Sequence, residues 1–288
     1  MVWYDVVDEL WNKKITEHGE PHHMSEIIEV DYSALASAFL RQDSGPFREL
    51  LEPLSTGAFL ILRDAFSISE ATQLKEISLA LRKSEGPSFS KIVEGCPNFW
   101  RDITEDETKS YSIKSIKKSS YFFPWNPTSS AVFKLVYPRW RVAKLLGGKP
   151  PTIYETNTPK DGSVDRVQIV EYPPGTGQIE PHRDPTQNQR IIISAYLSKK
   201  GVDYQGGGFW AMKSNGEKSN PEESIQVGDM GVCYADIIHG VDATDANLEI
   251  DMENFGTSAR GSRWFLGLHT VDSDEIDSRK TSIPVQLE

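Results

Sequence analysis

The residues best suited to metal chemistry are found among the six histidines of this chain. His182 opens the tripeptide His182-Arg-Asp184, and in an extended chain residues i and i+2 point to the same side. The imidazole of His182 and the carboxylate of Asp184 can therefore converge on one point. One imidazole and one carboxylate are two of the three ligands in the facial triad that leaves open positions on non-haem Fe(II). The tripeptide alone is weak evidence, because chance produces many copies of it.

A third ligand must come from elsewhere in the chain, and His239 is the candidate. It follows a turn and an apolar run at residues 228–238 and precedes Gly240. Its distance along the chain from Asp184 is large enough to place it on a facing sheet. The alternative is an ordinary buried or loop histidine without a metal.

The elements that must position these residues change in character near residue 150. The first half favours helices at 4–14, 31–42, 69–83 (with Ser69 as N-cap) and within 130–146, where Pro138 should break or kink the helix. It also contains a strand-like run at 57–63 and an irregular stretch at 84–128. The second half predicts short strands, separated by Gly and Pro turns, at 165–172, 190–197, 208–213, 229–235 and 262–271.

This order of elements predicts a mainly β fold with supporting helices. We expect a β-barrel or double-sheet jelly roll buttressed by N-terminal helices. The chain would form a single domain over 1–288. Residues 1–150 would supply helical support and substrate-side segments, and residues 151–288 the β core.

The composition argues against several classes of function. Lys plus Arg number 31 and Asp plus Glu 42, for a net charge of −11. An acidic chain is poorly suited to bind nucleic acid or an anionic membrane. No apolar run approaches a membrane span, and the first twenty residues do not resemble a signal peptide. Two cysteines are too few for a disulfide framework, so we expect a cytoplasmic protein.

Taken together, these segments resemble the Fe(II)- and 2-oxoglutarate-dependent dioxygenases, and most of all their prolyl 4-hydroxylase-like branch. The resemblance covers roughly residues 165–271, and the order and spacing of its pieces make it stronger than any one of them. The pieces are Gln168-Ile-Val-Glu-Tyr172-Pro-Pro-Gly175, His182-Arg-Asp184, Arg190-Ile-Ile-Ile-Ser-Ala-Tyr196-Leu197, Gly206-Gly-Gly208-Phe-Trp210, Val227-Gly-Asp229, His239-Gly-Val241 and Arg263-Trp-Phe-Leu-Gly267. It implies a double-stranded β-helix with iron held by His182, Asp184 and His239.

The resemblance also implies a basic residue on the last strand that pairs with the distal carboxylate of 2-oxoglutarate. A buried dicarboxylate needs a bidentate cation, for which Arg is suited, and Arg263 begins the last apolar strand. Arg260 is the competitor, in a loop-like segment. Tyr172 is a second candidate for this carboxylate, or else an ordinary aromatic residue at a strand end. The interval between His239 and Arg263 is longer than in relatives. The additional acidic segment, 242–260, is either a lid or a solvated loop.

The other four histidines, His18, His22, His23 and His269, are not expected to bind the metal. His22-His23 lies in a polar segment and indicates an exposed pair. His269 shares a strand face with Arg263 but lies about 20 Å further along an extended chain. We therefore expect His269 at the other end of the barrel.

The substrate is the least determined part of the site. Gln168 shares a face with Tyr172, and Trp210 follows a triple glycine, so both are candidates to line the cavity. Arg101 and Trp125 belong to an aromatic and basic segment outside the shared core, which either contacts substrate or packs as a flap.

The resemblance implies a dioxygenase that uses Fe(II), 2-oxoglutarate and O2. It would hydroxylate an unactivated C–H bond of a polar small molecule and release succinate and CO2. Desaturation, epoxidation and ring closure stay open, as does the oligomeric state. The alternatives are a peptidyl hydroxylase on the same core and a non-catalytic, cupin-like metal-binding protein.

Overall fold

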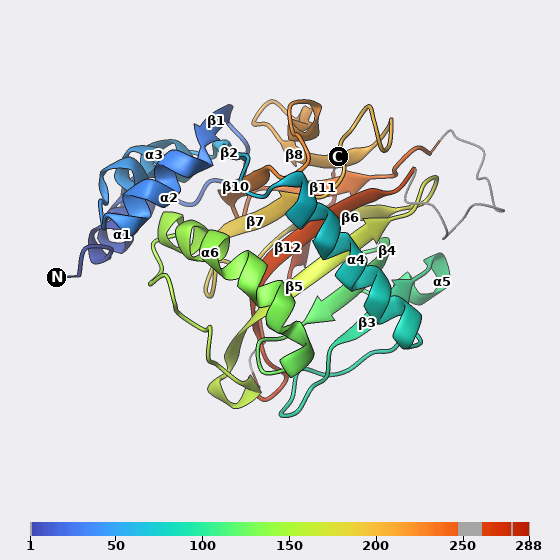
Figure 1. Cartoon of the computed structure of the whole chain (residues 1–288). Coiled ribbons are helices and arrows are strands. Elements are labelled where there is room, and N and C mark those ends of the chain that lie inside the picture. The colour runs from blue at the N-terminus through green and yellow to red at the C-terminus, as the bar shows by residue number, and fades with distance from the viewer. Residues whose placement is uncertain (1, 247–260, 278, 288) are drawn as a thin grey trace.

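The computed structural model describes residues 2–246, 261–277 and 279–287, in which the strands form one continuous sheet that folds back on itself. The strand order is β1-β2-β10-β7-β12-β5-β4-β6-β11-β8-β9, with β3 beside β4 and β13 beside β6. The step from β4 to β6 divides this sheet into a major half and a minor half (Figure 1). This is the jelly-roll architecture that the strand pattern predicts.

The major half contains the longest strands of the sheet. β12 (Arg263–Asp272) and β5 (Ser163–Tyr172) pair antiparallel over their full length at its centre. The strands that complete this half are β1 (Ile27–Asp31), β2 (Phe59–Arg63), β3 (Phe99–Ile103), β4 (Ser115–Phe122), β7 (Ile191–Tyr196) and β10 (Met230–Tyr234).

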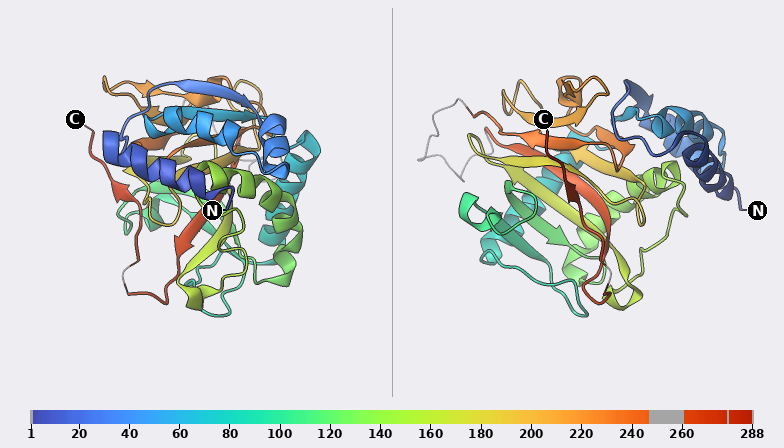
Figure 2. Two further views of the ribbon diagram at one scale, coloured as in Figure 1. Left: turned by 90° about the vertical axis from the view of Figure 1, so that its left-hand side faces the viewer. Right: turned by 180° about the vertical axis from the view of Figure 1, so that it is seen from behind.

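The minor half is built from short strands. They are β6 (Gln178–Arg183), β8 (Gly208–Met212), β9 (Lys218–Ser219), β11 (His239–Asp242) and β13 (Ile283–Pro284). Seen from behind in Figure 2, the chain after β12 runs back across this half, and β13 pairs with the end of β6.

Helices cover the outer face of the major half. α4 (Ile68–Ser84) and α6 (Ser130–Leu146) lie across it, while α1 (Asp5–His18), α2 (Tyr32–Leu40) and α3 (Gly45–Ser55) gather at one side (Figure 1). A short helix, α5 (Glu105–Thr108), precedes β4. None of the helices in the described part of the chain is both long and apolar enough to cross a membrane.

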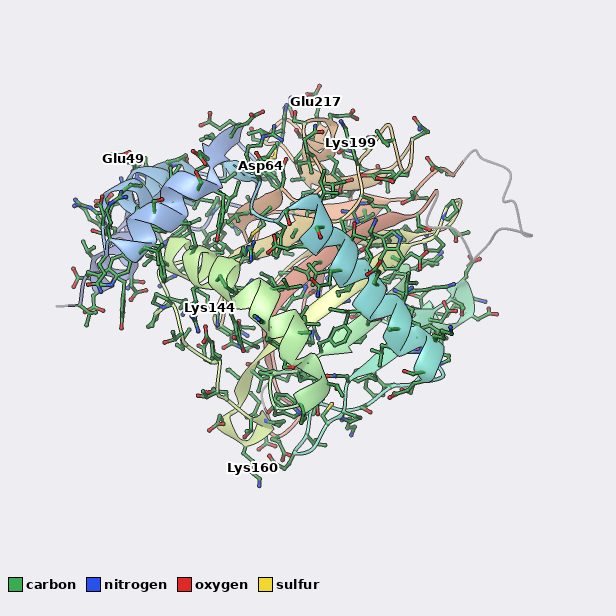
Figure 3. The ribbon with its side chains drawn as sticks, viewed as in Figure 1. Glu49, Asp64, Lys144, Lys160, Lys199 and Glu217 are labelled. Carbon is green, nitrogen blue, oxygen red and sulfur yellow. The ribbon has the colours of Figure 1, made fainter. Side chains whose placement is uncertain are left out.

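A buried ion pair fixes α6 to the sheet. The ammonium of Lys144 (Figure 3) lies 2.6 Å from Oδ2 of Asp165, and it also donates a hydrogen bond to the carbonyl of Ile153. The hydroxyl of Thr270 donates to the other carboxylate oxygen, at 2.9 Å. Burial raises the pKa of Asp165 to about 6, and it lowers the pKa of Lys144. Each charge therefore depends on the other to remain in the core.

The five strands predicted in the second half are confirmed within one or two residues. The predicted helices also form, with local corrections. The N-cap of α4 is Ser67 rather than Ser69, because Ser67 and Glu70 form a reciprocal capping box. Pro138 lies inside α6, which continues past it.

The expectation of irregular structure at 84–128 was wrong. β3, α5 and β4 lie in this stretch, and β4 connects the two halves of the sheet. The first half of the chain therefore contributes strands to the sheet as well as helices.

Candidate metal centre and its cavity

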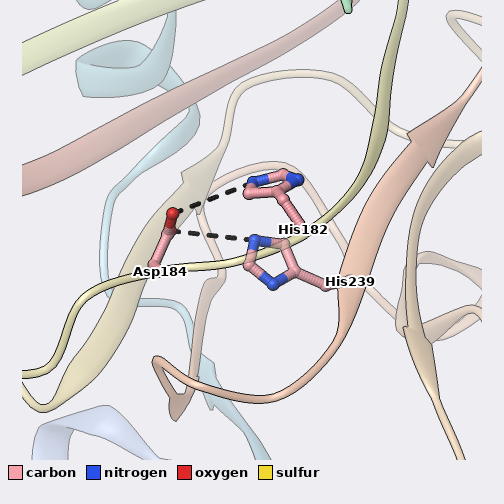
Figure 4. Close-up of side chains that lie close together, drawn as sticks. All are labelled: His182, Asp184 and His239. Atoms are coloured by element: carbon pink, nitrogen blue, oxygen red, sulfur yellow. Dashed lines mark ion pairs between the residues drawn. The ribbon is translucent and has the colours of Figure 1, made fainter. Parts of the chain in front are cut away.

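Two adjacent strands of the minor half bring the predicted metal ligands together. His182 near the end of β6 pairs directly with His239 at the start of β11, and their ring centroids are 4.2 Å apart. Asp184 follows β6 immediately. Its carboxylate oxygens lie 3.8 Å from Nε2 of His182 and 3.7 Å from Nε2 of His239 (Figure 4). One ligand atom from each residue lies within 4.8 Å of the others, a spacing that fits a single metal ion.

Backbone carbonyls fix which nitrogen of each ring is free. Nδ1 of His182 lies 2.8 Å from the carbonyl oxygen of Glu180, and Nδ1 of His239 lies 2.8 Å from that of Ile237. A carbonyl oxygen only accepts, so Nδ1 must carry the hydrogen and Nε2 presents a lone pair. Both rings are therefore in the tautomer that a metal requires.

Burial keeps His182 neutral. Desolvation, reinforced by the nearby His239, lowers the pKa of His182 to about 4. A neutral imidazole binds a metal without first releasing a proton. Asp184, the third residue of the triad, is held by two hydrogen bonds. The hydroxyl of Ser282, just before β13, donates to its Oδ1 at 2.5 Å, and the backbone N–H of Asp184 donates to the carbonyl of Ala235.

The triad opens into a cavity of about 320 Å³ between the two halves of the sheet. Three residues predicted for the cosubstrate or substrate line it: Gln168, Tyr172 and Arg263. Its volume is at the lower end of the range for small-molecule sites.

Arg263 carries an unexpected internal partner. Its Nε donates to both carboxylate oxygens of Glu222, at 2.8 and 3.0 Å, and its Nη2 donates to one of them. The hydroxyl of Tyr204 donates to the same carboxylate. Burial alone would lower the pKa of Arg263, but the ion pair with Glu222 outweighs it and raises that pKa. The guanidinium is therefore charged and held rigidly by one edge.

Two buried donor atoms beside the ion pair of Arg263 and Glu222 are available to a ligand. Nη1 of Arg263 and the hydroxyl of Tyr172 are both buried, and neither makes a well-formed hydrogen bond within the described residues. The guanidinium carbon lies 5.0 Å from the ring centroid of Tyr172. Unpaired buried donors are costly, so their presence at a cavity wall suits an acceptor such as a carboxylate.

Trp210, Arg101 and Trp125 do not line this cavity. On β8 the neighbouring Phe209 faces the cavity, so Trp210 faces away, with the ammonium of Lys218 at 4.4 Å from its ring centroid.

Arg101 and Trp125 instead complete small aromatic clusters. The Arg101 guanidinium lies 5.0 Å from the ring centroid of Phe89 and 5.1 Å from that of Tyr111. Trp125 stacks on Phe123, with ring centroids 4.8 Å apart, and donates a hydrogen bond from Nε1 to the carbonyl of Cys96. These packing contacts account for both side chains.

His269 is not part of the triad, as expected, but it lies in the same cavity. The expectation that it would be remote was wrong, because the cavity follows β12 along its length. Burial, followed by the charge of nearby Arg166, lowers the pKa of His269 to about 3. Residues 247–260 of the additional acidic segment, Arg260 among them, lie outside the described residues.

Five charged residues of the cavity region were missed from the sequence, and two of them, Arg279 and Lys280, lie in the segment after β12. Glu222 lies in a short 3-10 turn, Pro221–Glu223, where no periodic signal marks it. Lys117 lies on β4, in the stretch taken as irregular. Arg166 could have been found, because it shares a strand face with Gln168.

Comparison with known proteins identifies the fold. No protein-family model and no curated protein sequence matches this chain. Among solved structures, the full-length thymine-7-hydroxylase of Neurospora crassa in complex with alpha-KG and thymine is 12% identical, with 90% of this chain and 93% of that chain covered at a TM-score of 0.50. The chain has the jelly-roll fold of the 2-oxoglutarate- and Fe(II)-dependent oxygenases.

Two further solved structures are similar at lower scores. A prolyl hydroxylase from Trichoplax adhaerens, in complex with a peptide fragment of a hypoxia inducible factor, is 14% identical, covering 82% of this chain and 93% of that one at a TM-score of 0.49. An oxidoreductase of the 2OG-Fe(II) oxygenase family from Burkholderia pseudomallei is 13% identical, covering 91% and 98% at 0.45. At these identities the likeness concerns the fold.

Proposed function

We propose that this protein is a non-haem Fe(II)- and 2-oxoglutarate-dependent dioxygenase that hydroxylates an unactivated C–H bond of a polar small molecule. One observation carries the proposal. Two histidines with free Nε2 atoms and one carboxylate converge at the wall of a cavity that also contains two unpaired buried donors.

His182, Asp184 and His239 would hold the iron. They are the two-imidazole, one-carboxylate set that suits non-haem Fe(II) and leaves coordination positions open. Fe(II), when bound with 2-oxoglutarate and O2, supplies oxidative decarboxylation to succinate and CO2, coupled to hydroxylation of the substrate. The backbone carbonyls behind the two imidazoles keep both rings turned toward the metal position.

Arg263 and Tyr172 would bind the distal carboxylate of 2-oxoglutarate. Nη1 and the phenol hydroxyl are the available donors, and Glu222 fixes the guanidinium by its other edge. Because both donors are already buried, binding a carboxylate there removes little further water and satisfies two groups at once.

The substrate is proposed to be a small molecule. The cavity volume supports this, as does the fold shared with a thymine-7-hydroxylase that holds thymine. A cytoplasmic location is part of the same proposal, since both cysteines, Cys96 and Cys233, are free and buried.

Succinate formation tests the proposal. The full-length chain is incubated with 2-oxoglutarate and O2, with Fe(II) or with a chelator, and succinate is quantified with and without candidate substrates. We expect Fe(II)-dependent succinate release, lost in His239→Ala and retained in His18→Ala, which removes an exposed histidine far from the cavity. Succinate release that survives in His239→Ala, or that needs no metal, would reject the proposal.

A further inference from the structure

Two cationic side chains enter the cavity from neighbouring strands. Lys117 projects from β4 and Arg166 from β5, and both line the same cavity as the metal triad. They lie close enough for the charge of Arg166 to lower the pKa of Lys117. Neither residue belongs to the pair formed by Arg263 and Tyr172. Arg263 begins β12 and Tyr172 ends β5, further along the sheet.

Neither cation has an anionic protein partner within ion-pair distance in the described part of the chain. Arg166 makes one side-chain hydrogen bond, from Nη2 to the amide oxygen of Gln168 at 3.3 Å, and its Nε is buried without a partner. Its guanidinium otherwise rests against the ring of Tyr121, 5.4 Å from the centroid. No hydrogen bond or ion pair involves the ammonium of Lys117 within residues 2–246, 261–277 and 279–287.

Three other cations with little exposed side chain are matched by a carboxylate. They are Lys144 with Asp165, Arg82 with Glu171, and Arg263 with Glu222. A desolvated charge without a partner is strongly disfavoured, and in this respect Lys117 and Arg166 differ from these three paired cations.

The anions already assigned to the cavity do not match these two charges. Asp184 is the one carboxylate that the triad contributes, and it would be a ligand of the divalent metal. The two carboxylates of 2-oxoglutarate would be taken up by the metal and by Arg263. Arg279 and Lys280 also line the cavity, but both are exposed and Arg279 pairs with Asp274. The charges of Lys117 and Arg166 then remain for whatever else occupies the cavity.

We propose that Lys117 and Arg166 form an anion subsite that binds a carboxylate or phosphate group of the substrate. The substrate is thus an anionic small molecule. That the bound anion is a substrate rests on the proposed function, whereas the subsite itself is defined by the two cations and the cavity.

The protonation of Lys117 is consistent with such a subsite. Burial, Arg166 and Arg101 lower the pKa of Lys117 to about 8, while Asp184 acts in the opposite direction. A bound anion would favour the charged ammonium, and two adjacent donors of different shape suit a group with several acceptor oxygens.

Binding of a probe anion tests the subsite without depending on iron. The metal-free full-length chain is titrated with inorganic phosphate by calorimetry in the presence of a chelator. We expect saturable binding that weakens about tenfold or more in Lys117→Gln and in Arg166→Gln. Lys118→Gln, which removes the same charge from the opposite face of the same strand, should bind phosphate as the wild type does. Unchanged phosphate binding in both cavity variants would overturn the proposal.

A second titration separates the subsite from the cosubstrate anchor. Under anaerobic conditions with Fe(II), 2-oxoglutarate should bind Lys117→Gln with less than about threefold loss, whereas Arg263→Lys should lose affinity. The reverse pattern would make Lys117 and Arg166 the cosubstrate anchor and overturn the inference. Arg166→Lys keeps the charge and is the control for misfolding. It should retain part of the phosphate binding, and its thermal unfolding is measured in parallel.

Pairs of acids and their neutral methyl esters then link the subsite to turnover. In the succinate assay, stimulation by the acid of a pair should exceed that by its ester, and the difference should vanish in Arg166→Gln. Equal stimulation by acid and ester in the wild type would contradict an anionic substrate. Absence of any succinate release would defeat the proposed function and leave the phosphate result to stand on its own.

Discussion

Replacing Glu222 with Gln should tighten 2-oxoglutarate binding while it weakens the fold. Glu222 holds one edge of the Arg263 guanidinium, and the cosubstrate carboxylate would occupy the other. The two carboxylates would then face each other across one cation. At a separation of about 7 Å and an effective dielectric constant of about 20, their repulsion is about 2 kcal/mol, or about thirtyfold in affinity.

The same substitution removes the countercharge of a buried cation. Breaking a buried ion pair by removing one partner costs about 3–5 kcal/mol. Glutamine keeps a hydrogen-bond acceptor toward Arg263, so we expect a loss near the lower end of this range. Added 2-oxoglutarate should restore more stability to Glu222→Gln than to the wild type, because a tighter ligand stabilises the folded state more.

Urea unfolding with and without 2-oxoglutarate measures both effects, and anaerobic titration with Fe(II) gives the affinity directly. The control is Glu223→Gln, since Glu223 is exposed and pairs with Lys200 at the surface. Such a pair contributes about 0–1 kcal/mol. Weaker or unchanged 2-oxoglutarate binding in Glu222→Gln would show that the cosubstrate carboxylate does not bind Arg263.

Three further outcomes follow from buried groups. Arg263→Ala should raise the dissociation constant for 2-oxoglutarate by a factor of about 10² to 10³ in anaerobic titration, and should also lower stability, because it leaves a buried carboxylate unpaired. Lys144→Met should lower the free energy of unfolding in urea by about 3–5 kcal/mol, against about 0.5 kcal/mol or less for Lys134→Met on the exposed side of the same helix; equal losses would remove the ion pair as the cause. Cys96 and Cys233 should react with iodoacetamide at pH 8 only after unfolding, as mass spectrometry would show, because burial raises the pKa of both thiols and shields them; rapid labelling of the native chain would contradict this.

The metal triad could be anticipated from the sequence because its geometry is local. The i, i+2 spacing of His182 and Asp184 fixes their common direction in any extended chain. His239 was expected on a facing sheet, but it lies on β11, which pairs directly with β6 in the same half of the sheet. The strands that are apolar on both faces were also found, since a continuous apolar run marks them.

β4 escaped detection for a physical reason. Its inward face carries Lys117, which lines the cavity, and Ser119, which accepts a hydrogen bond from Gln168. The alternation of apolar and polar residues that marks a half-buried strand is therefore missing. Glu222 escaped because its role depends on a partner distant in the chain, Arg263, and no local pattern records that contact. Phe209 rather than Trp210 lines the cavity, because adjacent residues of a strand point to opposite faces.

Anaerobic equilibrium dialysis of Fe(II) against the full-length chain tests the central claim most directly. We expect one tightly bound iron per chain in the wild type, and loss of that iron in each of His182→Ala, Asp184→Ala and His239→Ala. 2-Oxoglutarate should bind the iron-loaded chain and be held far more weakly without metal. An iron stoichiometry that is unchanged in His239→Ala would contradict the assignment of the metal centre.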